Sequence, residues 1–312
     1  NRSTVVGFLD VSKAYDQVWR KGLLHKLFSK GLHGSFWGLL VSALKSMRRR
    51  MKAGCREHEE KSNFTPEEGV AQGAPESPVL FNLFMNDLIE ELRSEGFGVI
   101  FKDKRVPGLW FADDIALIAE SAEEIQRGFN ICTRYAKKWR FCFNGDKSAV
   151  VAFGSAGFRR AVKDNLFTCT SSIIRAQDEH EYLGVVFQNN LRWTRHIEKI
   201  LSTSKAASAH MAWTCRQNRS LRPRTAMYLW SAIVRPRLEY ACELWAQQIT
   251  ADQKRRIEKI QTDFIRKVIN APPGMPNVFL RAENGVERLQ ARWDKLTIRF
   301  VARVAAMDSD RL

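Results

Sequence analysis

Residues 109–119 read LWFADDIALIA, and this stretch decides the fold. Apolar residues on both sides of Asp113 and Asp114 predict two β-strands joined as a hairpin with two acids at its tip. Adjacent aspartates are common in ordinary turns, so the pair alone has an alternative interpretation without chemistry. The two strong apolar runs nevertheless place the tip at the edge of a buried sheet.

A second acid-ended strand precedes this hairpin in the chain. Residues 5–10 read VVGFLD and end in Asp10. If the two strands pair side by side, three carboxylates converge, and burying unpaired carboxylates is costly. Hard divalent cations that take oxygen ligands, Mg²⁺ or Mn²⁺, relieve such a cluster best. Two metal ions there can activate an attacking hydroxyl and stabilise the leaving oxygen of a phosphoryl displacement.

The composition is that of an ordinary folded protein. The 312 residues are 45% hydrophobic and 27% charged, which argues against disorder, a collagen-like repeat or a disulfide-dense scaffold. The six cysteines form no C-x-x-C pattern, so a zinc site is not expected. No apolar run is long enough to cross a membrane, and we expect an intracellular protein of the cytoplasm and nucleus. The start at Asn1, close to a strand, leads us to expect a fragment or a processed product.

The positive charge is concentrated in the last third of the chain. Fifty Lys and Arg against 34 Asp and Glu give a formal net charge of +16. Residues 191–312 hold 23 of the basic but only 11 of the acidic residues, so this region alone carries +12. Such charge often faces solvent without a partner, but nucleic acid is the commonest polyanionic partner. Beside a metal-binding acid cluster, it suggests polynucleotide chemistry.

Local signals predict the elements between the first strand and the hairpin. A helix is expected over residues 19–28 with Asp16 as its cap, and a second helix over 35–47. The second helix is expected to bury Phe36, Leu39, Leu40, Ala43 and Leu44. The run Arg48–Arg50 at its end is either a solvated helix terminus or a nucleic-acid contact. Residues 51–70 are polar and suggest a hairpin or loop.

Two further helices begin at capping signals. Ser77 is expected as the N-cap before Pro78, and Ser121 and Glu124 have the spacing of a capping box. The elements expected after them are strands at 149–153 and 182–187, then helices at about 193–217, 223–248, 252–270 and 286–306 with a break at 271–274. The map is a mixed α/β body of about 190 residues followed by a basic helical region.

Five short segments, in order along the chain, share the pattern of one family. They are FLDVSKAYD at 8–16, GVAQGAPESPVLFN at 69–82, FADD at 111–114, FNGDKS at 143–148 and YLGV at 182–185, followed by Leu191, Trp193 and His196. FADD alone is a weak signal, but five motifs in order and at sensible spacing are a specific one. The chain resembles the reverse transcriptases of non-LTR (LINE-like) retrotransposons, closely over residues 4–200 and loosely beyond.

The resemblance implies an α+β fold, the right-hand polymerase palm, in which helices pack on an antiparallel sheet. It assigns residues 1–190 to the palm, with a partial fingers insertion at about 22–70, and residues 191–312 to a helical, basic thumb and C-terminal region. The family's upstream fingers motifs, its endonuclease and its Cys/His knuckle have no counterpart in this sequence. In the second motif, Ala74 and Glu76 stand where the family more often has Ser and Leu.

The resemblance also implies the roles of the acids. Asp10 and Asp113 would bind both Mg²⁺ ions, or Mn²⁺ in their place, with the carbonyl of Val11 as a further ligand. Asp114 would support the cluster. These residues are therefore the expected catalytic and metal-binding set.

Four more residues take expected roles in substrate binding from the same resemblance. Tyr15 would be the steric gate that excludes a 2′-OH, although a core aromatic is the alternative interpretation. Gln72 and Gly73 would bound the nucleotide and template pocket, Gly73 by letting the backbone approach closely. Lys147 would stabilise the triphosphate charge or protonate the departing pyrophosphate, and a solvated surface lysine is its alternative.

Basic residues of the helical region are candidates for phosphate contacts, which give affinity without sequence choice. They are Arg216, Arg219, Arg222, Arg224, Arg235, Arg237, Lys254, Arg255, Arg256 and Lys259. We expect fewer than about half of them to contact nucleic acid. The tryptophans Trp193, Trp213, Trp230 and Trp245 are expected in the core instead.

The expected activity is RNA-directed DNA polymerisation by two-metal nucleotidyl transfer. An RNA (or DNA) template, a DNA primer with a free 3′-OH and dNTPs are the expected partners. Two alternatives are a catalytically silent nucleic-acid-binding remnant and a group II intron-type reverse transcriptase. The intact Asp10, Asp113 and Asp114 argue against loss of chemistry by mutation, whereas the missing upstream fingers argue for its loss by truncation.

Overall fold

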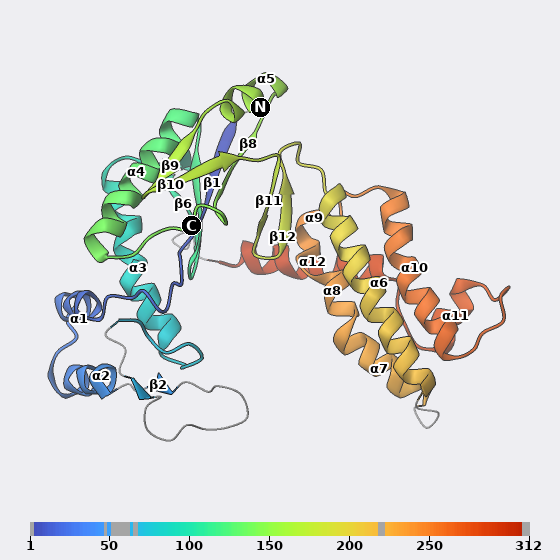
Figure 1. The fold of residues 1–312 in the computed structure, drawn as a ribbon. Helices are drawn as coiled ribbons and strands as arrows, with labels where there is room; N and C mark the ends of the chain where they lie inside the picture. The colour runs from blue at the N-terminus through green and yellow to red at the C-terminus, as the bar shows by residue number, and fades with distance from the viewer. Residues whose placement is uncertain (1–2, 47–48, 51–62, 65–67, 218–221, 308–312) are drawn as a thin grey trace. The chain divides into compact units, whose positions relative to one another are not determined.

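The structure is a computed structural model that describes residues 3–46, 49–50, 63–64, 68–217 and 222–307. The chain divides into two compact units, Asn1–Leu183 and Gly184–Leu312. Figure 1 draws the first unit in blue to green and the second in yellow to red. In the described part of the chain, no helix combines the length and the apolar character that crossing a membrane requires.

A six-stranded sheet forms the centre of the first unit. Its strands lie in the order β6-β7-β1-β8-β10-β9. Their bounds are β1 Thr4–Asp10, β6 Gly108–Phe111, β7 Asp114–Ala119, β8 Ala149–Phe153, β9 Phe167–Cys169 and β10 Ser172–Ala176. Neighbours are antiparallel except β8 and β10, which run parallel. The expected strands within residues 5–10, 109–119 and 149–153 are confirmed, and β9 and β10 extend the sheet beyond the prediction.

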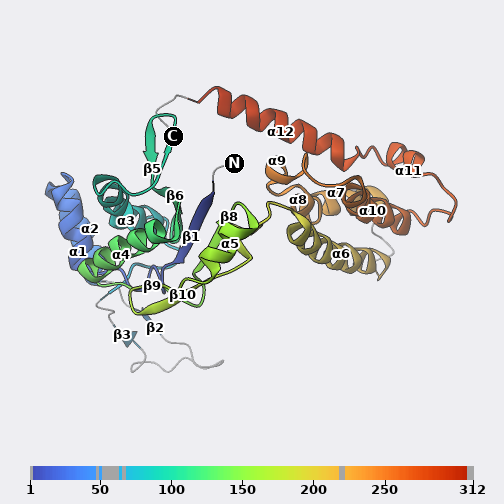
Figure 2. The same ribbon diagram turned by 90° about the horizontal axis from the view of Figure 1, so that it is seen from above.

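Two long helices, α3 (Ser77–Ser94) and α4 (Ala122–Trp139), lie on the left of the sheet in both views (Figures 1 and 2). α4 packs on β1, β7 and β9 and buries Phe129. The ring of Phe129 occupies the place where a side chain on Gly7 would lie, only 2.6 Å from a Cβ built there. A glycine in this central strand therefore makes room for the helix. The sheet and its helices confirm the α+β class.

Ser121 confirms one capping prediction, and Ser77 corrects another. The Ser121 hydroxyl accepts a hydrogen bond from the Glu124 backbone N–H at 3.1 Å, which satisfies one free donor of α4. The Ser77 prediction is wrong by one residue, because α3 begins at Ser77 itself and Glu76 occupies the N-cap position without a side-chain bond. Pro78 still lies in the first turn of the helix, where its missing N–H needs no partner.

Asp16 does not cap the next helix, α1 (Arg20–Ser29), so that prediction is wrong. Asp16 belongs to a tight turn in which its N–H donates to the Lys13 carbonyl at 2.8 Å. Lys13, the first residue of this turn, adopts the left-handed region with φ of 45°. The helix begins only after the turn has closed.

α2 (Gly34–Ser46) forms as expected but lies closer to the surface than expected. Of the five residues predicted inside, Leu44 is buried, whereas Phe36 and Leu39 are 62% and 64% exposed. The helix packs on α1, and its Leu44 carbonyl accepts a hydrogen bond from Arg20 at 2.7 Å. Apolar periodicity predicts a helix and its face, but it does not show what covers that face.

Two pairs of short strands and one short helix also belong to the first unit. β2 (Arg49–Arg50) pairs antiparallel with β3 (Asn63–Phe64). The prediction that the arginine run ends a helix is wrong for Arg49 and Arg50, because α2 ends at Ser46 and these two residues lie in a strand. The hairpin or loop expected over residues 51–70 stays a prediction. Arg48 and most of residues 51–67 lie outside the described residues. The other elements are the hairpin β4 (Val99–Phe101) and β5 (Lys104–Val106), and α5 (Ala156–Lys163) beside β8.

The backbone at Gly69 is fixed against the turn that follows β1. Its N–H donates to the Val18 carbonyl at 2.8 Å, and the next N–H donates to the Tyr15 carbonyl at 2.8 Å. The buried guanidinium of Arg20 donates to the Gly69 carbonyl at 2.7 Å. Gly69 has φ of 84°, and a Cβ there would lie 2.9 Å from the Tyr15 carbonyl oxygen. Glycine is therefore required at this position both for conformation and for space.

A lysine is buried between α1, α3 and α4. The ammonium of Lys26 lies 3.2 Å from Asp87, 2.5 Å from the Tyr135 hydroxyl and 3.8 Å above the Trp139 ring, and it donates to the Phe84 carbonyl. Burial lowers its pKa to about 8, against the pull of Asp87. These contacts join the three helices that support the sheet.

Seven helices form the second unit. They are α6 Thr194–Gln217, α7 Pro223–Ile233, α8 Arg235–Glu239, α9 Cys242–Trp245, α10 Ala251–Val268, α11 Asn277–Glu283 and α12 Leu289–Ala305 within the described ranges. Two paired strands, β11 (Glu179–Tyr182) and β12 (Val185–Gln188), precede them. The single strand expected at 182–187 is wrong, because Leu183 and Gly184 form a turn inside that range, both with positive φ. The break at residues 271–274 is confirmed, and Thr250 caps α10 in a capping box with Gln253.

The helix expected over residues 223–248 is wrong, because the chain breaks it into α7, α8 and α9. Pro236 lacks an N–H and its ring conflicts with the carbonyl four residues earlier, which ends α7 at Ile233. Ala241 then adopts the left-handed region with φ of 52°. The last expected helix begins at Leu289 rather than 286, and the short helix α11 was outside the prediction.

The tryptophan predictions are mostly confirmed. Trp230 and Trp245 are fully buried in the core of the second unit, and Trp193 packs on it from a half-buried position. The prediction for Trp213 is wrong, because its side chain is 54% exposed and stacks on His210. Trp293 belongs to the same core and donates to the Leu238 carbonyl at 3.0 Å.

Gly69→Ala is expected to destabilise the protein more than Gly73→Ala. Both glycines have φ near the left-handed region, at 84° and 87°, so both variants acquire the same kind of backbone strain. A Cβ on Gly73 meets no atom within 4 Å, whereas one on Gly69 meets backbone. Urea unfolding is expected to show an extra loss of about 1–3 kcal/mol for Gly69→Ala. Equal losses of unfolding free energy in the two variants would contradict the close approach of other backbone to Gly69.

Lys26→Met is expected to lower the free energy of unfolding by about 2–4 kcal/mol at neutral pH, because it removes a paired, hydrogen-bonded charge from the core. The pKa of Lys26 is about 8 when folded and 10.5 in its ordinary state, so the unfolded chain binds more protons between these values. As pH rises from 8 to 10, the free energy of unfolding of the unaltered protein therefore increases relative to that of Lys26→Met, by at most about 3 kcal/mol. A difference that stays constant or shrinks would contradict this environment for Lys26.

Candidate active site

The register of the sheet brings the predicted acids together. β1 and β7 pair so that Asp10 lies opposite Asp114, and β6 pairs with β7 so that Phe111 lies opposite Asp114. Opposite residues of an antiparallel pair point to the same face, with Cβ atoms about 5 Å apart. Asp113 lies in the two-residue tip between β6 and β7, after Ala112 with φ of 53°. The hairpin therefore presents Asp113 and Asp114 beside the end of β1.

The three carboxylates affect one another electrostatically. Burial raises the pKa of Asp10, and Asp113 raises it further while Lys147 lowers it. Burial likewise raises the pKa of Asp114, with added repulsion from Asp113 and Asp10. Negative charge is thus concentrated beyond what the neighbouring side chains neutralise, which is the environment that attracts a cation.

The backbone of Asp10 is held by the segment that precedes β8. Its N–H donates to the Ser148 hydroxyl at 3.2 Å, and its carbonyl accepts the Asn144 N–H at 2.8 Å. Ser148 is buried and donates in turn to the Asn144 carbonyl at 2.6 Å. Ser148 belongs to the FNGDKS motif, but its role was not predicted, since no local pattern shows a contact 138 residues away.

The backbone carbonyl of Val11 takes no part in the hydrogen bonds that join the residues after β1 to the residues before β8. Val11 forms a bridge with Phe143, made by the Asn144 N–H to the Asp10 carbonyl and the Ser12 N–H to the Cys142 carbonyl. Neither bond uses the Val11 carbonyl. An oxygen next to Asp10 is therefore left for another partner.

Lys147 lies at the acids, as its motif suggests. Its ammonium is 3.9 Å from a carboxylate oxygen of Asp10, and its side chain is 68% exposed. An exposed pair of this kind contributes little to stability, about 1 kcal/mol at most. Lys147 can therefore leave Asp10 for a more negative partner at small cost.

The structure brings Gln72 close to the segment after β1 that holds Tyr15, whereas Gly73 lies in open space. The half-buried ring of Tyr15 packs on Phe81, with centroids 5.4 Å apart, and Gln72 donates to Asp16 at 3.4 Å. The segment that holds Tyr15 and the segment that holds Gln72 meet through the backbone hydrogen bonds around Gly69. Gly73 is exposed, and a Cβ built on it meets no atom within 4 Å, so its predicted role toward a nucleotide or template stays a prediction.

Tyr182 of the last motif lies beneath the hairpin. Its hydroxyl is 3.5 Å from the carbonyl oxygens of Asp114 and Leu109, and burial followed by the charge of Asp114 raises its pKa to about 12. Its ring also lies 5.5 Å from that of Phe8 on β1. The YLGV motif therefore supports the strands that carry the acids.

The acids are suited to a metal site in which the substrate provides some of the ligands. Among the described residues, no group of three or more His, Cys, Asp or Glu side chains is arranged to hold a metal ion. Mg²⁺, however, is usually bound by one or two carboxylates together with substrate phosphates and water, not by a cage made only of protein. Two aspartates, a spare carbonyl and uncompensated negative charge match that pattern.

The second unit carries a basic groove between α6 and α10. It is a cavity of about 450 Å³ whose cationic residues are Lys205, Arg256, Lys259 and Lys267. Within the described part of the chain these four have no ion-pair partner, although Asp263 also lines the groove. Of the predicted cations, Arg256 and Lys259 lie here, whereas Arg255 pairs with Asp252.

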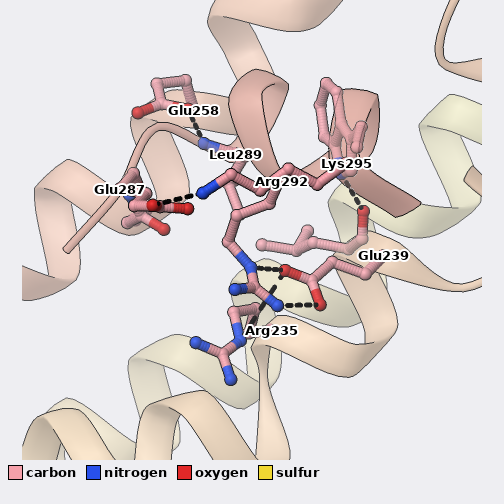
Figure 3. A network of polar contacts seen from close by, with 10 residues as sticks. Arg235, Glu239, Glu258, Glu287, Leu289, Arg292 and Lys295 are labelled. Atoms are coloured by element: carbon pink, nitrogen blue, oxygen red, sulfur yellow. Dashed lines mark hydrogen bonds and ion pairs between the residues drawn. The ribbon is translucent and has the colours of Figure 1, made fainter. Parts of the chain in front are cut away.

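The other predicted cations do not gather in this groove. Arg235 pairs with Glu239 at 3.6 Å, and Arg292 binds the same carboxylate through both oxygens (Figure 3). Arg222 precedes α7, and Arg224, Arg237 and Lys254 lie on α7, α8 and α10 without lining the groove. Arg219 and the side chain of Arg216 lie outside the described residues.

Proteins of mobile elements are similar to this chain in sequence. The chain is 28% identical over 273 residues to the RNA-directed DNA polymerase from mobile element jockey of Drosophila funebris, covering 85% of this chain and 28% of the relative. It is 24% identical over 318 residues to the jockey polymerase of Drosophila melanogaster, covering 97% of this chain and 32% of that one. The chain thus spans less than a third of these curated relatives.

Among solved structures, the apo telomerase of Candida tropicalis is similar, with a TM-score of 0.45, 11% identity and coverage of 99% of this chain and 52% of that one. The sequence pattern of the family described as "Reverse transcriptase (RNA-dependent DNA polymerase)" matches residues 1–187. That match covers more than half of the chain and includes every predicted site residue of the first unit. The chain belongs to the reverse transcriptase (RNA-dependent DNA polymerase) family.

Proposed function

We propose that this chain carries the polymerase centre of a non-LTR retrotransposon reverse transcriptase. It adds dNTPs to the 3′-OH of a DNA primer, directed by an RNA or DNA template, in the cytoplasm and nucleus. The observation that carries the proposal is the pairing of Asp10 with Asp114 beside Asp113, in a chain of this family. In the proposal, residues 1–190 are the palm, with part of the fingers at about 22–70, and residues 191–312 are the thumb.

Dependence on divalent metal ions is general in this family, and we propose two Mg²⁺ ions here, with Mn²⁺ as a substitute. When bound, the ions would lower the pKa of the primer hydroxyl and stabilise charge on the departing pyrophosphate. Asp10 and Asp113 would hold them, with the carbonyl of Val11 as a further ligand. Asp114 would add negative charge beside them, while Ser148 fixes the backbone of Asp10.

The residues proposed to bind the nucleotide come from the two segments that meet at Gly69. Tyr15 would lie beneath the sugar and exclude a 2′-OH, since its ring is held by Phe81. Gln72 and Gly73 would border the nucleotide and the template, where the open space around Gly73 leaves room for a ligand. Lys147 would move from Asp10 to the triphosphate when the nucleotide binds.

The basic groove of the second unit is proposed to bind the phosphates of the primer–template duplex. Four cations without ion-pair partners among the described residues line it. Contacts of this kind release counterions and give affinity that falls steeply with salt but does not depend on sequence. RNA template and DNA primer are therefore the proposed partners of the second unit.

Asp113→Asn is expected to lower primer extension with Mg²⁺ by more than about a thousandfold, because it removes a charged metal ligand while keeping size. Asp164→Asn is the matched control, since Asp164 is an exposed carboxylate at the end of α5. The control should extend the primer like the unaltered chain. Equal extension by the unaltered chain and Asp113→Asn would contradict the proposed metal site.

Tyr15→Val is expected to raise incorporation of rNTPs relative to dNTPs by about tenfold or more, because the smaller side chain no longer meets the 2′-OH. Tyr15→Phe keeps the ring and should keep the preference for dNTPs. Single-nucleotide extension with each substrate measures the ratio. A preference that Tyr15→Val leaves unchanged would assign Tyr15 to the core rather than to the nucleotide.

A further inference from the structure

The segment before β8 forms one tight turn that carries Lys147 beside Ser148. In this turn, residues 144–148, the Ser148 N–H donates to the Asn144 carbonyl at 3.0 Å, and the Asn144 side-chain oxygen accepts the Asp146 N–H at 3.1 Å. Lys147 and Ser148 are neighbours at the end of the turn. A contact that fixes the backbone of Ser148 therefore also fixes the point from which the Lys147 side chain extends.

Both ends of the turn are bonded to the backbone of Asp10. The Asn144 N–H donates to the Asp10 carbonyl at 2.8 Å, and the Ser148 hydroxyl accepts the Asp10 N–H at 3.2 Å. The pairing of β1 with β8 ends where Phe8 lies opposite Ala149, so beyond this point the hydroxyl takes the place of a backbone acceptor. The turn thus holds Asp10 through both its donor and its acceptor.

The Ser148 hydroxyl is buried and makes two hydrogen bonds. It donates to the Asn144 carbonyl at 2.6 Å while it accepts the Asp10 N–H, and the residue is only 2% exposed. Without the hydroxyl, the Asp10 N–H would face a buried methyl group. A backbone donor in such a place is costly to leave unpaired, so we expect Asp10 to move when the hydroxyl is removed.

The turn is fixed from its other side by β10. A Cβ built on Gly145 would lie 2.6 Å from the Cβ of Ser172 and 3.2 Å from the Ile173 carbonyl oxygen. Glycine therefore lets the turn lie directly against this strand. The turn is thus held between β10 and the end of β1.

The side chain of Lys147 reaches the same aspartate. Its ammonium lies 3.9 Å from a carboxylate oxygen of Asp10. Ser148 therefore acts on Asp10 in two ways, directly through the Asp10 N–H and indirectly through the placement of Lys147. Groups that orient a metal ligand without touching the metal commonly change its affinity by about 10–100-fold when they are removed.

We infer that Ser148 is a positioning residue of the proposed polymerase centre, whose hydroxyl holds the Asp10 carboxylate and the Lys147 ammonium in one geometry. It acts through these two side chains and not through contact with the substrate. The hydroxyl thereby sets the affinity of Asp10 for a divalent metal ion. The inference rests on the proposed function, because it requires that Asp10 binds such an ion.

Binding of Mn²⁺ to the full chain tests the inference, with the free ion counted by electron paramagnetic resonance and no nucleotide present. Ser148→Ala removes only the hydroxyl and is expected to weaken Mn²⁺ binding by about tenfold. Ser148→Thr keeps the hydroxyl and should bind Mn²⁺ within about twofold of the unaltered chain. A folded Ser148→Thr chain that binds as weakly as Ser148→Ala would overturn the inference, because the hydroxyl would then not matter.

Thr133→Val is the matched control for the loss of a hydroxyl. The Thr133 hydroxyl on α4 also accepts a distant backbone N–H, that of Thr170 at 2.8 Å, and donates to the Phe129 carbonyl at 2.8 Å. Its removal breaks bonds of the same kind but leaves those of Asp10 intact. Melting temperatures show that both variants fold, and only Ser148→Ala should lose Mn²⁺ affinity. Equal losses of Mn²⁺ affinity would assign Ser148 to general stability and refute the inference.

A double-mutant cycle tests whether Ser148 also places Lys147. Lys147→Met removes a cation that competes with Mn²⁺ for Asp10, so alone it should strengthen Mn²⁺ binding by about two- to fivefold. In the Ser148→Ala background the same change should alter Mn²⁺ binding by less than about twofold, because Lys147 is then no longer held at Asp10. Additive effects of the two substitutions would contradict a single geometry set by Ser148.

Asp10→Asn separates this result from that of the proposed function. It removes the proposed ligand itself and should lose the Mn²⁺ bound at the site. If Asp10→Asn binds Mn²⁺ like the unaltered chain, the proposed metal site fails and the inference fails with it. If Asp10→Asn loses binding but Ser148→Ala retains it, the metal site stands and only the role of Ser148 fails.

Discussion

The antiparallel pairing of β1 with β7 is the constraint on which the candidate site depends. The register that sets Asp10 opposite Asp114 puts both carboxylates side by side on one face, and a slip by one residue would turn Asp10 to the other face. Contacts outside the site fix this register: β8 pairs along the other edge of β1, and Phe129 fills the space beside Gly7. Ser148 and Asn144 then hold the backbone of Asp10. The costly grouping of acids is thus stabilised by the core and by backbone hydrogen bonds.

Much of the first unit was predictable because its signals are local. The apolar runs around Asp113 predicted the hairpin, and Ser121 with Glu124 predicted the start of α4. The depth of α2 was not predictable, since periodicity shows which face is apolar but not what covers it. The breaks between α7 and α9 had a visible signal in Pro236, which the apolar pattern outweighed. The contacts of Ser148 and Gly69 join segments distant in sequence, so only the folded chain reveals them.

The two units have opposite chemistry. The first concentrates carboxylates at the end of a buried sheet, where burial and mutual repulsion raise the pKa values of Asp10 and Asp114. The second presents cations on helices, some neutralised in the network around Glu239 and others without partners in the described part of the chain. In the proposed polymerase the acids would bind metal ions and the cations would bind phosphates, and the addition of a nucleotide to a strand requires both. The Gly69 contacts connect the acids to the segments proposed to hold that nucleotide.

Cleavage of the backbone by Fe²⁺ bound in place of Mg²⁺ tests the central claim most directly, because hydroxyl radicals cut only the chain close to the ion. With primer–template and a dNTP present, the account predicts cuts in two separate segments, near Asp10 and near Asp113, and competition by Mg²⁺ should suppress both together. Asp113→Asn should lose both cuts. Cuts confined to one segment, or unchanged in Asp113→Asn, would contradict a metal site shared by β1 and the hairpin.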